Sequence, residues 1–245
     1  MILNECIIWG GGKSISEGIS LGLKEKLQNK FVIVCNYGFR HFDGTFLCFH
    51  DRDFYKPKPE AKNPDIYEEL KSLSLLIGMN LNGIEEFKLK NTILLKHSDN
   101  YHREKCIENG FYSANLTGIL ALTLASYLMD YNGTIFLLGF DWNRRNPNEI
   151  NKEKYSGKTN LKIHYYDDIK HRGLGYVGFY ECHNPNNYFK YFDKEKDLKI
   201  YNVSLNSNIQ NFEKISYTTM FSKLNNVVYD QNDLRNYIKE KICIK

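Results

Sequence analysis

The chain has 245 residues, of which 42% are hydrophobic, and its 33 basic and 29 acidic residues give a formal net charge of +4. This length is sufficient for one large domain with a buried core. The charge balance is too even to indicate a nucleic-acid-binding protein. No stretch approaches the ~20 apolar residues of a membrane span and no signal peptide is recognisable, so we expect a cytoplasmic protein. Peripheral contact with the inner membrane surface is left open.

Cysteine usage points to a reducing compartment. The six cysteines are far apart in the sequence and form no C-x-x-C pair. Several lie within apolar runs, which indicates buried reduced thiols and no zinc site. We therefore predict no metal site among the cysteines.

A short apolar run, Ile7-Ile8-Trp9, is followed by three glycines, a lysine and a serine. Glycines let backbone N–H groups approach an anion, and a helix that follows adds a partial positive charge. The segment Gly10-Gly11-Gly12-Lys13-Ser14 therefore predicts a phosphate-binding turn, with an ordinary strand-to-helix turn as the alternative. A P-loop is disfavoured, because its G-x-x-x-x-G-K-[ST] spacing needs glycine where the sequence has Ile7.

Further apolar runs predict strands at residues 31–36, 45–51, 92–97, 134–141 and 199–204, and helical spacing predicts helices at residues 66–77, 117–129 and 233–245. We expect the last helix to be exposed and basic. Continuous apolar strands separated by helices predict a Rossmann-like α/β fold with a mostly parallel sheet and helices on both faces. Ligands bind beyond the carboxyl ends of such strands, which makes Asn36, His50 and Asp141 candidate contacts. The buried helix at residues 117–129 offers a second anion site at its N-terminus.

Residues 142–197 are polar and rich in tyrosine, and we interpret them as a lid inserted into a single domain of residues 1–245. His171 is a candidate general base for a hydroxyl group. Arg144, Arg145 and Arg172 are candidates to neutralise a departing phosphate. The alternative is a solvated polar loop. Asp167 and Asp168 with Asp141 would suit a divalent ion, although adjacent carboxylates on a loop are often only solvated.

Five short motifs also occur in an order that resembles a known group of proteins. They are Gly10-Gly11-Gly12-Lys13-Ser14, Cys35-Asn36-Tyr37, Asn115-Leu116-Thr117-Gly118, Leu138-Gly139-Phe140-Asp141 and Asn206-Ser207. The group is the bacterial sialyltransferases of glycosyltransferase family 42, together with the related MptE-like, 6-hydroxymethylpterin pyrophosphokinase-like superfamily. The resemblance implies a Rossmann-like sheet that binds a nucleotide, a lid over the donor and a histidine base from that lid.

The resemblance also implies roles for single residues. The glycine turn, Asn36, His50 and Gly139 correspond to nucleotide-binding strand ends. Thr117 and Gly118 correspond to a donor-contacting pair, and His171 to the catalytic histidine. Trp142-Asn143 follows Asp141 where the sialyltransferases have Phe-Tyr. We therefore expect Tyr155, Tyr165 or Tyr166, or else Arg144 and Arg145, to hold the phosphate.

Three functions remain open from the sequence. The first is a glycosyltransferase that moves a sugar from a nucleotide-sugar donor to a glycan, lipid-linked or other hydroxyl acceptor, with His171, Arg172 and Asp141 as catalytic residues and no required cofactor. The second is a Mg²⁺-dependent pyrophosphokinase that acts on a pterin-like alcohol with ATP. The third is a non-catalytic nucleotide-binding module. The oligomeric state is left open.

Overall fold

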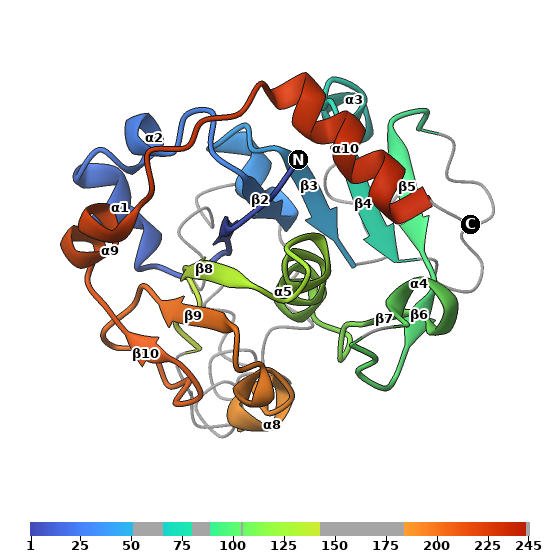
Figure 1. Cartoon of the computed structure of the whole chain (residues 1–245). Helices are drawn as coiled ribbons and strands as arrows, with labels where there is room; N and C mark the ends of the chain where they lie inside the picture. Colours follow the sequence, from blue (N-terminus) through green and yellow to red (C-terminus); the bar gives the residue numbers. More distant parts are fainter. Residues whose placement is uncertain (51–65, 80–88, 104, 143–183, 244–245) are drawn as a thin grey trace, which may run out of the picture.

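The computed structural model describes residues 1–50, 66–79, 89–103, 105–142 and 184–243 (Figure 1). Eight of the described strands form one sheet in which all neighbours are parallel, in the order β10-β9-β8-β1-β2-β3-β4-β5. The strands are β1 (Glu5–Trp9), β2 (Val32–Cys35), β3 (Phe46–Phe49), β4 (Leu76–Met79), β5 (Thr92–Leu95), β8 (Gly133–Leu138), β9 (Leu198–Asn202) and β10 (Glu213–Lys214). A small second sheet pairs β6 (His97–Ser98) with β7 (Phe111–Tyr112).

The helices connect these strands and cover the sheet. They are α1 (Ile15–Ser20), α2 (Leu23–Lys26), α3 (Ile66–Lys71), α4 (Cys106–Asn109), α5 (Thr117–Leu128), α8 (Asn186–Phe189), α9 (Tyr217–Lys223) and α10 (Gln231–Cys243), with 3₁₀ turns η1 (Asn36–Arg40) and η3 (Phe192–Lys194). The predicted Rossmann-like α/β fold is therefore confirmed. The predicted lid lies mostly outside the described residues.

The strand order places a topological switch point between β1 and β8. The chain steps outward from β1 to β5, and β8 then returns to pair with the other side of β1. In open parallel sheets, ligands bind in the crevice beyond the carboxyl ends of the strands where the order reverses. The turns that follow β1 and β8 lie at this crevice.

Alternate side chains of the central strands point to opposite faces of the sheet. One face packs against α5 and α10 in the larger core, and the other packs against α1, α2 and α9. A third cluster packs Leu70 of α3 against β3 and β4. Figure 1 shows α5 and α10 on the same side of the sheet and α1 beside α9. Helices cover both faces, as predicted.

The prediction of one helix over residues 66–77 is wrong, because only residues 66–71 are helical and Leu76–Met79 form β4. Leu76, Ile77 and Met79 are fully buried, and pairing with β3 and β5 outweighs the helical spacing. The sequence also did not indicate α4 at Cys106–Asn109.

The C-terminal helix is not simply exposed and basic, and that prediction is corrected. Leu234, Ile238 and Ile242 of α10 are buried in the larger core. Two of its basic residues are also engaged: Arg235 donates to the Thr45 carbonyl at 2.8 Å and Lys241 to the Asp130 carboxylate at 2.7 Å. The apolar face of α10 and these contacts hold the helix on the sheet.

The docking of α10 predicts a large loss of stability on truncation of its central residue. Ile238 is 0% exposed, so Ile238→Ala should lower the free energy of unfolding by about 2–5 kcal/mol through lost burial and a residual cavity. Urea denaturation measures this change, with the exposed Glu240→Ala as the control. Equal stability of the two variants would contradict the assigned packing.

Four of the five cysteines in the described part of the chain are buried free thiols, as predicted. They are Cys6, Cys35, Cys48 and Cys106, whereas Cys243 is exposed, against expectation. Burial raises the pKa of Cys35 to about 12. Such a thiol stays protonated and is a poor nucleophile or metal ligand.

Candidate ligand-binding site

The turns after β1 and β8 are joined by backbone hydrogen bonds. The N–H of Gly10 donates to the carbonyl of Leu138, and the N–H of Gly12 donates to the carbonyl of Gly139, both at 2.8 Å. A Cβ on Gly12 would lie 2.5 Å from the Gly139 oxygen, and Gly139 has a φ of +69°. Glycine is therefore required at position 12, where a Cβ would clash with the backbone, and at position 139, where the backbone is left-handed.

The side chain of Asp141 also joins the turn after β8 to the turn after β1. One carboxylate oxygen accepts from the backbone N–H of Ser14 at 2.9 Å, and the other accepts from the Ser14 hydroxyl at 2.5 Å. Asp141 is 7% exposed. A carboxylate at the first turn of a helix satisfies free N–H groups and interacts favourably with the helix dipole.

This contact changes the interpretation of the glycine turn. The Asp141 carboxylate occupies the position at the start of α1 that a bound phosphate would take, and α1 has only six residues. Lys13 is exposed on the surface of the turn. A phosphate at this turn would have to share Ser14 with Asp141, so the ordinary strand-to-helix turn agrees better with the geometry.

The Asp141–Ser14 contact should be measurable as a coupling energy. Asp141→Ala removes both acceptors and should lower the free energy of unfolding by about 2–3 kcal/mol, whereas Ser14→Ala should lower it by about 1 kcal/mol. The double variant should lose less than the sum, by about 1 kcal/mol, because the hydroxyl bond is counted in both single variants. Denaturant unfolding of the four proteins measures this. Strictly additive losses would contradict the contact.

Asn36 and Thr117 meet on the other side of the switch point. Asn36 follows β2 directly, and the hydroxyl of Thr117 at the start of α5 donates to the Asn36 side-chain oxygen at 3.0 Å. The residue before α5, Leu116, supplies no side-chain cap. Among the described residues, no atom accepts a hydrogen bond from the backbone N–H of Thr117 or of Gly118. The N-terminus of this 12-residue helix therefore presents free donors and the positive end of a helix dipole.

Of the seven described non-glycine residues with a positive φ, four lie at the carboxyl edge of the sheet or before α5, and the other three precede β2 or β8. Asn36 (φ +48°), Ala114 (φ +48°), Asn115 (φ +58°) and Trp142 (φ +42°) are non-glycine residues in the left-handed region. Each follows a strand or precedes α5. Left-handed geometry is unfavourable for such residues and persists where the surrounding contacts hold it, often at ligand-binding sites.

His50 directly follows β3 at the same edge and is 6% exposed. Its Nε2 atom has no hydrogen-bond partner among the described residues, and its ring lies 6.3 Å from the ring of His97. Burial, and then the neighbouring His97, lowers the pKa of His50 to about 4. His50 is therefore neutral near pH 7 and offers an unpaired nitrogen. The sequence did not single out His97, which pairs with Phe111 on the strand that leads towards α5.

The lowered pKa of His50 predicts a loss of stability in acid. The unfolded chain protonates this histidine below about pH 6.5, whereas the folded protein does so only below about pH 4. The stability should therefore fall between these two pH values, by up to about 3 kcal/mol. His50→Gln should flatten this pH dependence in urea denaturation measured from pH 7 to pH 4.5. Parallel curves for the two proteins would contradict the assignment.

The loop after β9 holds the turn after β8 in place. Asn202 Nδ2 and the Ser207 hydroxyl both donate to the carbonyl of Phe140, at 3.1 and 2.7 Å, and Asn208 Nδ2 donates to the carbonyl of Trp142 at 2.8 Å. Phe140 in turn packs against Gly118, where a Cβ would lie 2.8 Å from its ring. Ser207 thus has a structural role, and Asn202 and Asn208 are site-supporting residues that the sequence did not single out.

The sequence-predicted site residues fall into three groups. Gly10, Gly12, Ser14, Gly139 and Asp141 form the joined turns, whereas Asn36, Thr117, Gly118 and His50 lie around the start of α5 and the ends of β2 and β3. Gly11 and Lys13 belong to the first turn. The predicted base, phosphate ligands and loop carboxylates lie outside the described residues; they are Arg144, Arg145, Tyr155, Tyr165, Tyr166, Asp167, Asp168, His171 and Arg172.

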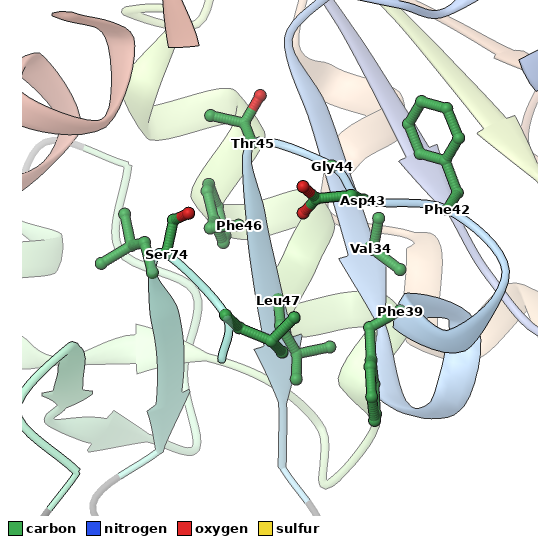
Figure 2. Close-up of a pocket in the computed structure, with 11 residues that line it drawn as sticks. Val34, Phe39, Phe42, Asp43, Gly44, Thr45, Phe46, Leu47 and Ser74 are labelled. Carbon is green, nitrogen blue, oxygen red and sulfur yellow. The ribbon is translucent and has the colours of Figure 1, made fainter. Parts of the chain in front are cut away.

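A separate hollow lies along β2 and β3. Figure 2 shows Thr45 and Ser74, which precede β3 and β4, at one end of it and Phe39 of the η1 turn at the other, with Leu47 of β3 between them. None of the candidate site residues lines this hollow. In the part of the chain that the structure describes, no group of three or more His, Cys, Asp or Glu residues is arranged to hold a metal ion. Likewise, none of the described helices has the length and apolarity needed to cross a membrane.

Comparisons of the chain with models of known protein families, with curated proteins and with solved structures found no match.

Proposed function

We propose that the protein is a transferase that uses a nucleotide-activated donor, specifically a glycosyltransferase of the sialyltransferase-like group that moves a sugar to an acceptor hydroxyl. One observation supports the proposal. The strand order reverses between β1 and β8, and beside this switch point Asn36 at the end of β2 lies next to the N-terminus of α5, which has no side-chain cap. Nucleotides bind at such edges because free backbone N–H groups and a helix dipole favour their phosphates.

In this proposal the donor phosphate lies against the start of α5 rather than in the glycine turn. Thr117, Gly118 and Asn36 provide donors on that side, whereas the N–H groups of Gly10, Gly12 and Ser14 are already bound to the β8 turn. The glycine turn then forms one wall of the site. His50 contributes a neutral imidazole that can hydrogen-bond to the ribose or the base.

The base of the reaction is assigned from the sequence. It is His171, and the residues expected to stabilise the leaving phosphate are Arg144, Arg145 and Arg172. All four lie outside the described residues. Among the described histidines, His50 is unsuited to this role, because a pKa of about 4 makes its imidazole a weak base at neutral pH. The acceptor is a glycan, a lipid-linked sugar or another hydroxyl compound.

The pyrophosphokinase alternative needs Asp141, together with Asp167 or Asp168, to hold Mg²⁺ on ATP. Both carboxylate oxygens of Asp141 accept hydrogen bonds from Ser14, so metal binding would compete with the contact that joins the β1 and β8 turns. This geometry favours the metal-independent transferase. The non-catalytic module makes the same prediction for nucleotide binding and differs only in lacking turnover.

A thermal-unfolding screen of CMP, UDP, GDP, ADP and their sugars tests the proposal. One nucleotide family should stabilise the protein, by about 3 kcal/mol at a concentration near 100 times its Kd. Binding and sugar transfer should persist in EDTA, whereas the kinase alternative predicts that transfer from ATP is lost. A protein that none of these compounds stabilises would contradict the proposed function.

A further inference from the structure

Two buried imidazole nitrogens lie beyond the carboxyl ends of β3 and β5 without a hydrogen-bond partner. They are the Nε2 atoms of His50, which is 6% exposed, and of His97, and no described residue supplies a partner for either. A buried polar atom without a partner is unfavourable, which points to a water molecule or an ion that binds it. Because the two side chains are neighbours, one ligand can serve both nitrogens.

The two rings are close enough to share one ion. Their centroids are 6.3 Å apart and their planes make an angle of 70°, so the rings do not stack. Two imidazoles on one tetrahedral metal ion have centroids about 5–5.5 Å apart, because their metal–nitrogen bonds measure about 2.0–2.1 Å. The His97 side chain is 26% exposed, and the χ2 torsion of histidine is soft. A rotation of this ring therefore closes the remaining distance of about 1 Å.

The surroundings of the pair favour a cation. The Oδ1 atom of Asp99 lies 3.9 Å from Nε2 of His97, which is too long for a hydrogen bond but places a negative charge beside the two rings. Burial, and then His97, lowers the pKa of His50 to about 4, so the His50 ring is neutral near pH 7. A neutral imidazole binds metal ions, whereas a protonated one does not.

The chemistry of the two ligands selects the kind of ion. Within the described residues, no group of three or more His, Cys, Asp or Glu is arranged to hold a metal ion, so the protein ligands are the two imidazoles. Imidazole suits transition-metal ions such as Zn²⁺ and Ni²⁺, and water completes the coordination at such an open site. Mg²⁺ prefers oxygen ligands and is not expected to bind here.

We propose that His50 and His97 bind one divalent transition-metal ion through their Nε2 atoms, at the carboxyl edge beyond β3 and β5. This inference goes beyond the proposed function, because the proposed transfer needs no metal. The bound ion takes the His50 nitrogen that is otherwise available to the ribose or the base. It should therefore weaken nucleotide binding and act as an inhibitor.

Isothermal titration of the untagged protein with Zn²⁺ tests the inference. His50→Gln and His97→Gln each remove one of the two ligands, so each should raise the Kd of the site at least about tenfold. His102→Gln is the matched control, because it removes an imidazole from the same stretch of chain outside the pair, and its Kd should stay within about twofold. Equal Kd values for the wild type, His50→Gln and His97→Gln would overturn the inference. So would equal affinity of the wild type for Zn²⁺ and Mg²⁺.

A second measurement does not depend on how well the variants fold. Zn²⁺ is diamagnetic, so long-range nitrogen–proton NMR spectra of the wild-type protein can follow both imidazole rings during the titration. The ring signals are assigned by their loss in His50→Gln and in His97→Gln. Both sets should move together and saturate at the same Zn²⁺ concentration. Movement of one ring without the other, or of neither, would contradict a shared ion.

Failure of the proposed function can be told apart from failure of this inference. The Zn²⁺ titrations contain no nucleotide, so they decide the metal site whether or not a nucleotide binds. With the nucleotide that stabilises the protein most, Zn²⁺ should raise the nucleotide Kd of the wild type but not that of His97→Gln, which keeps His50. An unchanged nucleotide Kd in wild-type protein saturated with Zn²⁺ would overturn the inhibition.

Discussion

The contact between the turn after β1 and the turn after β8 determines the shape of the carboxyl edge. Two backbone bonds and the Asp141–Ser14 pair join the places where the strand order reverses. This contact uses the N–H groups of Gly10, Gly12 and Ser14, whereas within the described residues the N–H groups of Thr117 and Gly118 at the start of α5 have no acceptor. The position of the candidate anion site follows from where the backbone hydrogen bonds have already been made.

The two sides of the switch point therefore have different chemistry. The β1–β8 side is closed, with glycines that allow close approach and a buried carboxylate that caps α1. The β2–β3 side is open, with the Asn36 amide, the start of α5 and the unpaired Nε2 of His50. A negatively charged group is disfavoured beside Asp141 and favoured beside α5. This asymmetry supports a donor that lies across β1 and β2 with its anionic part towards α5.

Local patterns predicted most of the strands and the buried helix, because continuous apolar runs and strand-end polar residues are visible within short windows. The contacts of the site could not be predicted from such short windows. Ser14 and Asp141 are 127 residues apart and Asn36 and Thr117 are 81 apart, so their pairing depends on the strand order. The strand β4 was missed because its buried run continues a helical pattern, and α10 was misjudged because its charges obscured the apolar positions 234, 238 and 242.

We propose that the nucleotide binds at the β1–β2 edge with its phosphate towards α5. A crystal structure of the protein with the nucleotide that stabilises it most tests this directly. We expect a phosphate oxygen within hydrogen-bonding distance of the Asn36 NH₂ group or the first N–H groups of α5, with Asp141 still bound to Ser14. A nucleotide that displaces Asp141 from Ser14, or one bound in the hollow along β2 and β3, would contradict this placement.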